Sequence, residues 1–310
     1  MKKYNCFGIR IFLKKTTRVA LLAATLCYSV ISYATDPLVL QSDFGVKDAA
    51  VASMKGVAVG VSRDIDIYDL THEVPAYNIW EASLRLAQAA EYWPKGTVFV
   101  SVVDPGVGTA RKSVVLKTKF GHYYVTPDNG SLTAVAEQQG IEAVREIDEA
   151  VNRLKNSEKS YTFHGRDVYA YTGARLAAGV ISFEQVGQKL PNKVMMIPYQ
   201  KPQFDGKKLV GNIEILDPQY GNIWTNIDRD TFNKIKLAFG DKVNVKVSNE
   251  GKTIFEGAMP YSRSFGEVAV GETLMYLNSL NNVSLAVNQG NFSEKFQVLS
   301  GASWSIEISR

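Results

Sequence analysis

Hydrophobic and polar positions alternate along the first two thirds of the chain in a way that predicts strands and helices in turn. The apolar runs 38–40, 64–70 and 97–103 are typical of strands, each ending in a polar or glycine-containing turn. Between them, 48–60 and 78–92 carry apolar residues at helical spacing. Two more strands are predicted over 113–118 and 122–126, followed by a helix over 131–140. This alternation predicts an α/β domain with a central mixed sheet.

The pattern changes after about residue 195. Pro198 and Pro202 mark a linker over 196–207, and short β-rich runs separated by turn residues follow it. These runs are 208–216, 222–227, 242–248, 252–257, 273–277, 283–288 and 294–298. We therefore expect an α/β domain over 35–195 and a small all-β domain, barrel-like or a sandwich, over 208–310.

The first 34 residues differ from the rest in charge. They contain six Lys and Arg residues and no acidic one, so their removal changes the formal net charge from +4 to 4 − 6 = −2. An apolar run over 19–31 follows the basic part, and Ser32 and Ala34 flank Tyr33 as a signal peptidase site would require. Residues 1–34 are thus predicted to be a signal peptide, and the mature protein to be exported, periplasmic or secreted, without a stable membrane span. A buried N-terminal helix would not need six clustered cations, and the bulky Leu26 before Cys27 disfavours a lipoprotein.

The remaining composition restricts the chemistry. Both cysteines, Cys6 and Cys27, lie in the predicted leader, which excludes disulfides, thiolate zinc sites and cysteine nucleophiles from the mature chain. Only three histidines, His72, His122 and His164, are present, which argues against a multi-histidine metal site. A nearly neutral mature chain gives no indication of nucleic-acid binding. We expect a small-molecule substrate and neither a metal nor a cofactor.

Polar residues gather in four places where predicted strands end, and in an open α/β sheet such ends meet in a ligand-binding crevice. The four clusters are Asp43 with Asp48, Asp69 with His72, Asp104 with Arg111, and His164 with Arg166 and Asp167. Any one of them, taken alone, is more often a turn or a salt bridge.

Asp104 begins a glycine-rich turn, 104–109, directly after a buried strand. Its backbone N–H groups could approach a ligand closely, although no Gly-Lys-Ser/Thr follows as in a phosphate-binding Walker loop. A purely structural turn remains equally consistent with the local sequence. His164, beside an arginine and an aspartate, is a candidate general base.

A second polar turn, 217–222, lies between two β-like runs. Asp217 could hold an ammonium group, Tyr220 could stack on a base, and Asn222 could bond a base edge. Locally, an ordinary hairpin turn rich in Asp, Gly and Asn explains the segment better.

Taken together, the ordered motifs resemble the S-adenosylmethionine (SAM) hydroxide adenosyltransferase family, the SAM hydrolases related to fluorinating and chlorinating enzymes. The motifs that carry the resemblance span nearly the whole mature chain: Ser42-Asp43-Phe44-Gly45, Asp69-Leu70-Thr71-His72, Val103-Asp104-Pro105-Gly106-Val107-Gly108 with Arg111, Pro127-Asp128-Asn129-Gly130, Phe163-His164-Gly165-Arg166-Asp167, Asp217 with Tyr220-Gly221-Asn222, Thr225-Asn226-Ile227, and Asn278-Ser279 with Ala286-Val287-Asn288.

The resemblance implies a homotrimer in which substrate lies between the first domain of one subunit and the second domain of its neighbour. It further implies that Asp43 binds the ribose hydroxyls, with Tyr77 near the sugar. Asp217 would hold the methionine amino group and Ser279 its carboxylate. The adenine would contact Tyr220, Asn222 and, as a weaker candidate, Gln289.

In the hydrolytic branch an Asp-Arg-His triad handles water, which corresponds to Asp104, Arg111 and His164. Arg111 would favour the hydroxide form, His164 could accept the proton, and Asp104 would orient them. Halogenating relatives resemble one another in having Tyr-Pro in place of Asp104-Pro105 and Tyr-Ser in place of His164-Gly165. We therefore expect hydrolysis of SAM at the 5′-carbon to adenosine and L-methionine. A halogenase and a non-catalytic periplasmic binder of adenosyl compounds are the alternatives.

Overall fold

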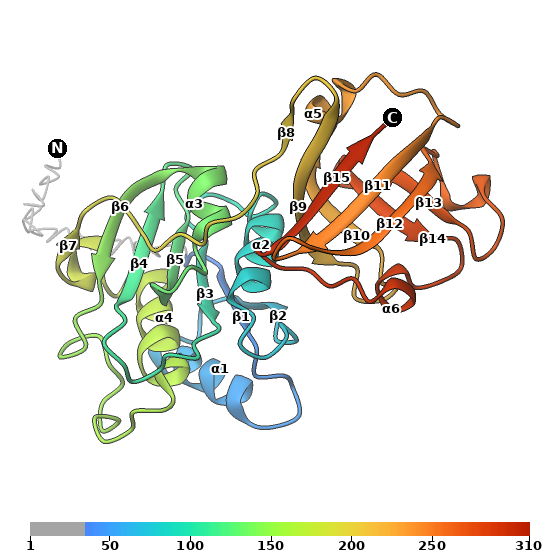
Figure 1. Ribbon diagram of the computed structural model, residues 1–310. Coiled ribbons are helices and arrows are strands. Elements are labelled where there is room, and N and C mark those ends of the chain that lie inside the picture. The colour runs from blue at the N-terminus through green and yellow to red at the C-terminus, as the bar shows by residue number, and fades with distance from the viewer. Residues whose placement is uncertain (1–34) are drawn as a thin grey trace, which may run out of the picture. The chain divides into compact units, whose positions relative to one another are not determined.

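The computed structural model describes residues 35–310, and the predicted signal peptide lies outside them. The first sheet has the strand order β2-β1-β3-β5-β4-β6-β7 (Figure 1). Its strands β1, β2, β3 and β5 run parallel, whereas β4, β6 and β7 pair antiparallel, so the predicted mixed sheet is confirmed. The strands are β1 Leu38–Ser42, β2 Ile67–Thr71, β3 Val98–Val102, β4 Ser113–Thr118, β5 Tyr123–Pro127, β6 Ile141–Glu146 and β7 Lys189–Leu190.

Helices cover both faces of this sheet because its central strands are apolar on both sides. Leu38 and Leu40 of β1 pack in one cluster with residues of α1 (Ala50–Val61) and α4 (Tyr171–Ala177). Val39, between them, packs on the opposite face with residues of α2 (Ile79–Ala90) and α3 (Thr133–Gln139). This strict alternation of neighbours gives the three-layer arrangement expected of a doubly covered parallel core.

The second sheet is antiparallel throughout, with the order β12-β11-β15-β9-β10-β14-β13 and β8 paired to β9 (Figure 1). Tyr261, just after β12, bridges to Met275 of β13, which brings the two end strands together and makes the sheet barrel-like, as predicted. The strands are β8 Gln203–Phe204, β9 Lys208–Leu216, β10 Ile223–Asp228, β11 Lys242–Asn249, β12 Lys252–Pro260, β13 Thr273–Leu277, β14 Asn282–Val287 and β15 Trp304–Ser309. A short helix, α5 Arg229–Asn233, follows β10.

One predicted element is wrong. The run 294–298 was expected to be a strand but lies largely in helix α6, Phe292–Phe296. Asn291 caps this helix by accepting a hydrogen bond from the backbone N–H of Glu294 at 2.9 Å. Phe292 and Phe296, four residues apart, contact each other on one face of the helix, with ring centroids 4.7 Å apart. An N-cap and an i, i+4 aromatic pair therefore outweigh the β-like composition.

Within residues 35–310, no helix combines the length and the apolar character needed to cross a membrane.

Candidate functional site

Three neighbouring parallel strands deliver polar residues to the same edge of the first sheet. Asp43 follows β1, His72 follows β2, and Asp104 comes two residues after β3. Asp43 and Asp104 line a cavity of about 240 Å³, together with His164. The remaining lining residues are Phe44, Ala76, Tyr77, Val102, Val107, Thr162, Phe163 and Gly165. The cavity thus lies at the carboxyl ends of the strands, where ligands bind in open α/β sheets.

Asp104 and Arg111 form a buried, bidentate ion pair. Arg111 Nε donates to both carboxylate oxygens at 3.0 Å, and Nη2 donates to Oδ2 at 2.5 Å. The two side chains are only 4% and 11% exposed, respectively. Burial lowers the pKa of Arg111, but the hydrogen bonds to Asp104 and the nearby charges outweigh it and hold this pKa above its usual value. Arg111 is therefore a permanent cation, compensated locally by one carboxylate.

His164 is held by the same arginine. Arg111 Nη2 lies 3.2 Å from His164 Nδ1, and because a guanidinium can only donate, Nδ1 accepts. A neutral His164 then carries its hydrogen on Nε2, a buried atom that has no partner among the described residues. Burial lowers the pKa of His164, and the charges of Arg111 and Arg153 add to this effect while Glu149 opposes it. The neutral ring is thus favoured near pH 7.

Two glycines allow the loops around the triad to approach closely. A Cβ on Gly165 would lie 3.1 Å from the Phe44 ring and 3.2 Å from Val102. Gly108 adopts a φ of +77°, and a Cβ there would lie 2.9 Å from the carbonyl oxygen of Tyr161. A side chain at either position would therefore press on its neighbours, which explains why both motifs have glycine there.

Two polar residues beneath the triad were not anticipated from the sequence. Ser113 Oγ accepts a hydrogen bond from Arg111 Nη1 at 3.0 Å and lies 3.1 Å from the hydroxyl of Tyr169. Tyr169 is fully buried in the π-helical segment Gly165–Ala170, directly after His164, and its pKa is raised well above the usual value, chiefly by burial. Only the five-residue spacing between His164 and Tyr169, an unusual helical period, could have suggested that they share a site.

Asp43, the predicted ribose ligand, lines the cavity, and a hydrogen bond holds one of its carboxylate oxygens. Its Oδ2 accepts from the backbone N–H of Tyr77 at 2.9 Å. Tyr77 lines the same cavity, is 72% exposed, and has a φ of 66°. Asp48, by contrast, accepts from the backbone N–H of Ala50 at the start of α1 and has a structural role.

Three residues predicted to contact substrate line a second cavity, of about 630 Å³, on the second sheet: Tyr220, Asn222 and Gln289. Asp217 adjoins them, because Asn222 Nδ2 donates to Asp217 Oδ2 at 3.4 Å. Tyr220 is 64% exposed, so its ring is free to stack on a ligand. This cavity shares no lining residue with the one at Asp104.

Ser279 lies elsewhere. It lines a third cavity with Asp228 and Glu214, neither of which borders the other two cavities. The neighbouring Asn278 has a structural role, since its side-chain oxygen accepts from the backbone N–H groups of Leu280 and Asn282. The chain itself therefore does not bring Ser279 together with the other predicted substrate contacts.

Other residues of the motifs stabilise the loops. Asn129 Nδ2 donates to the carbonyl oxygen of Val103 at 2.9 Å, which fixes the strand end that carries Asp104. Arg166 pairs with the buried Asp167 at 2.7 Å.

Residues 35–310 contain no group of three His, Cys, Asp or Glu side chains arranged to hold a metal ion.

Two family models match most of the described chain. The N-terminal domain of the SAM hydroxide adenosyltransferase family matches residues 38–187, and its C-terminal domain matches residues 211–305. An (R)-S-adenosyl-L-methionine hydrolase of Methanocaldococcus jannaschii is 36% identical over 69% of this chain and 74% of its own length. A second one, from Thermus thermophilus, is 30% identical over 86% of this chain and 97% of its own.

More distant and structural relatives extend the similarity. A fluorinase of Actinopolyspora mzabensis is 27% identical over 88% of this chain and 97% of its own length. The crystal structure of an uncharacterised conserved protein from Thermotoga maritima, 37% identical, superimposes with a TM-score of 0.77 over 88% of this chain and the whole of that one. The chain belongs to the SAM hydroxide adenosyltransferase family.

Proposed function

We propose that this protein hydrolyses S-adenosyl-L-methionine at the 5′-carbon, giving adenosine and L-methionine. The observation that carries the proposal is the buried Asp104–Arg111 pair, whose guanidinium contacts His164 Nδ1 and leaves Nε2–H for a ligand. A carboxylate next to the reacting position repels a bare halide, whereas water can both donate to it and accept from Nε2–H. The relatives named SAM hydrolase agree with this choice, and the relatives named fluorinase make halogenation the alternative to test.

The proposed reaction is an in-line displacement. The water oxygen forms a bond to C5′ while the C5′–S bond breaks, and its electron pair leaves on sulfur as a neutral thioether. His164 donates from Nε2–H to the water oxygen and so positions it, rather than accepting its proton, because Nδ1 is engaged with Arg111. The oxonium formed by the attack is strongly acidic, and the nearby Asp104 carboxylate can take its surplus proton. Placement of this kind is worth about 7–11 kcal/mol in well-oriented model systems.

No cofactor is required by this chemistry, because the sulfonium centre is already an activated leaving group. Asp43 would bind the ribose hydroxyls, with Tyr77 beside the sugar. On the second sheet, Asp217 would hold the methionine amino group, and Tyr220, Asn222 and Gln289 would contact the adenine. Ser279 lines neither of the two cavities that hold these residues, and its contact with the carboxylate stays a prediction.

We further propose a homotrimer in which the cavity at Asp104 of one subunit faces the cavity at Tyr220 of its neighbour. The support is that the predicted ligands of one substrate line two cavities without a shared residue. Export to the periplasm or beyond, through residues 1–34, likewise remains a proposal that depends on the sequence alone.

The proposal predicts that the oxygen atom of the attacking water becomes the 5′-hydroxyl oxygen of adenosine. Purified protein incubated with SAM in ¹⁸O-labelled water should release methionine and adenosine labelled at the 5′-hydroxyl, as measured by liquid chromatography and mass spectrometry. Asp104→Asn should lower kcat roughly 100-fold, a loss common when a group that acts in the transition state is removed. Asp48→Asn, which removes a carboxylate outside the cavity, should leave kcat unchanged.

Two results would overturn hydrolysis. Formation of 5′-halo-adenosine in the presence of chloride or fluoride, without labelled adenosine, would show a halogenase. Binding of SAM without any product would show a binding protein.

A further inference from the structure

Under the Asp43 loop lies a row of four linked side chains, here called the histidine brace: Ser42, His72, Asp69 and Lys55. Ser42 Oγ lies 2.7 Å from His72 Nδ1, and His72 Nε2 lies 3.0 Å from Asp69 Oδ1. Lys55 Nζ, on α1, donates to Asp69 Oδ2 at 2.6 Å. Asp69 and His72 formed one of the four polar clusters in the sequence, and the proposed hydrolysis assigns them no role.

The direction of every bond in the histidine brace is determined. Burial raises the pKa of Asp69, but the hydrogen bonds to Lys55 and His72 outweigh burial and hold it below its usual value, so Asp69 is an ionised acceptor. His72 Nε2 must therefore donate, and in the tautomer that carries its only hydrogen there, Nδ1 accepts from the Ser42 hydroxyl. Ser42 Oγ in turn accepts the backbone N–H of Phe44 at 3.3 Å. The hydrogen bonds form one continuous chain, so changing one member disturbs the rest.

Serine, histidine and aspartate are also the residue types of an acyl-transfer triad, but the geometry here excludes one. Ser42 is completely buried and does not line the cavity that Asp43 and Phe44 line. Its oxygen already accepts a backbone hydrogen bond, and its hydroxyl donates to the ring. The four residues therefore have a positioning role.

The histidine brace holds Asp43 from both sides. Ser42, just before it, is bound by the His72 ring, and Gly45, two residues after it, donates its N–H to the His72 carbonyl oxygen at 2.7 Å. Asp43 Oδ2 is occupied by the N–H of Tyr77, so Oδ1 is the oxygen left to receive a hydroxyl. A shift of the loop by a fraction of an ångström would misdirect that oxygen.

We infer that His72, fixed by Asp69 and Lys55, is a positioning residue that sets the Asp43 loop for recognition of the ribose hydroxyls. This inference rests on the proposed role of Asp43 in binding an adenosyl substrate. Because the loop orients a ground-state contact, its loss affects substrate capture more than the chemical step.

The test compares a buried histidine in the histidine brace with a buried histidine outside it. His72→Gln keeps an amide N–H for Asp69 but has no acceptor at the position of Nδ1, which contacts Ser42. His122→Gln disturbs a buried ring bonded to Tyr124, Gln139 and the carbonyl oxygens of Trp93 and Pro94. We expect His72→Gln to raise KM for SAM about tenfold, the effect of roughly 1.4 kcal/mol, with kcat changed less than about twofold. His122→Gln should lower Tm without changing KM.

A substrate lacking the ribose 2′-hydroxyl isolates the contact. With the 2′-deoxy analogue of SAM, wild type and His72→Gln should differ less than about twofold in KM, because the positioned carboxylate has lost its partner. Equal losses on both substrates, or an unchanged KM for SAM in a folded His72→Gln, would overturn the inference.

A second pair of variants, with less disruptive substitutions, allows the same test if His72→Gln does not fold. Asp69 is partly exposed, so Asp69→Asn is expected to fold, and Asp66→Asn, an exposed carboxylate just before β2, is its control. Calorimetric titration with adenosine and 2′-deoxyadenosine separates this inference from the proposed function, since it needs no turnover. Wild type that binds adenosine but leaves SAM intact would refute the hydrolysis alone. Asp69→Asn that keeps the wild-type preference for adenosine would refute the role of the histidine brace alone, and wild type without any preference would refute both that role and the ribose contact of Asp43 while leaving the hydrolysis open.

Discussion

The hydrogen bond of 3.2 Å between Arg111 and His164 decides a question that the residue types leave open. A histidine near a water-activating arginine can donate or accept at the reacting atom. With Arg111 donating to Nδ1, only Nε2–H remains for a ligand, so in the proposed reaction His164 would direct water through a hydrogen bond. Protonation would place an N–H of the ring against the arginine N–H and break this arrangement.

This geometry predicts an acid limb in the pH profile of kcat/KM. Activity should rise as His164 loses its proton, with an apparent pKa below the usual value of about 6.5, because burial lowers the pKa of this ring. Glu149 raises that pKa through its charge, so Glu149→Gln should move the limb to still lower pH. Glu256→Gln, on an exposed position of the second sheet, should leave the profile unchanged. A wild-type limb above about pH 6.5, or no shift in Glu149→Gln, would contradict the assignment.

At this scale the sequence predicts which residues meet but not how. Asp104, Arg111 and His164 were recognised from motifs, and they do contact one another. The ring orientation depends on a π-helical segment that begins at Gly165, and no local pattern encodes it. Tyr169 and Ser113 were missed because each looks like an ordinary core or strand residue until the fold brings their hydroxyls within 3.1 Å.

The elements of the first domain position the site through close packing at a small number of contacts, one of which lies at Gly165. Gly165 lets the segment after His164 lie against Phe44 and Val102, whose side chains belong to two different strand ends. Phe44 in turn packs edge-to-face on Phe163, with ring centroids 5.8 Å apart. A single methyl group at this junction would therefore press on the wall of the cavity.

Gly165→Ala should destabilise the protein by about 1–3 kcal/mol and raise KM, because the new Cβ would lie 3.1 Å from the Phe44 ring. Urea unfolding and steady-state kinetics measure the two effects. Gly56→Ala on α1 is the matched control, since nothing lies within 4 Å of its Cβ and helix propensity favours alanine by up to about 1 kcal/mol. Equal changes in the free energy of unfolding of the two variants would show that the packing around position 165 can accommodate a methyl group.

The periodicity of apolar residues predicts a strand well where both of its faces are buried. It predicts an element poorly where a few individual side-chain interactions determine whether a helix or a strand forms. The strand predicted over 97–103 is β3, fully buried along its length. The run 294–298 was misassigned because the decisive signals, the Asn291 cap and the Phe292–Phe296 contact, are individual interactions that a β-like composition conceals. Strand β15, at the end of the chain, was overlooked although alternate residues are buried.

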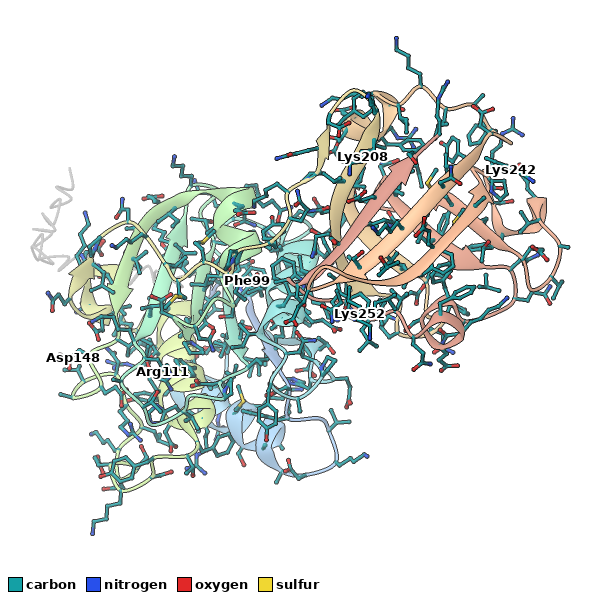
Figure 2. All side chains as sticks on the ribbon, in the orientation of Figure 1. Phe99, Arg111, Asp148, Lys208, Lys242 and Lys252 are labelled. Carbon is teal, nitrogen blue, oxygen red and sulfur yellow. The ribbon has the colours of Figure 1, made fainter. Side chains whose placement is uncertain are left out.

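For the whole molecule, the notable feature is that the predicted substrate ligands lie on two sheets in separate cavities. Figure 2 shows Arg111 with the first sheet, while Lys208, Lys242 and Lys252 mark strands of the second. The sequence gives the order of the motifs but contains no information on which copy of the chain supplies each half of a site. Distances between cavities on different subunits follow from assembly, which no pattern along one chain encodes.

Subunit mixing tests the proposed assembly. Asp104→Asn and Asp217→Asn are each expected to lose most of the activity, but mixed trimers contain intact sites wherever an unaltered first domain meets an unaltered second domain. Random mixing in equal amounts should restore about a quarter of wild-type activity, because each half is intact with a probability of about one half. Mixing Asp104→Asn with His164→Gln, both on the first sheet, should restore none. Mixed trimers verified by native mass spectrometry that stay inactive in the first case would place the whole site within one chain.

The charges around the cavity at Asp104 also bear on how products leave. Asp43 and Asp104 line it with two carboxylates, and the guanidinium of Arg111 pairs with Asp104, so a surplus of one negative charge remains when His164 is neutral. In the proposed reaction the sulfonium of the substrate would be attracted to that surplus, whereas the thioether and the alcohol formed from it would not. Breaking the C5′–S bond would therefore remove the electrostatic part of the affinity once the reaction is complete, and the uncharged sulfur and hydroxyl groups of the products would leave more readily than the sulfonium.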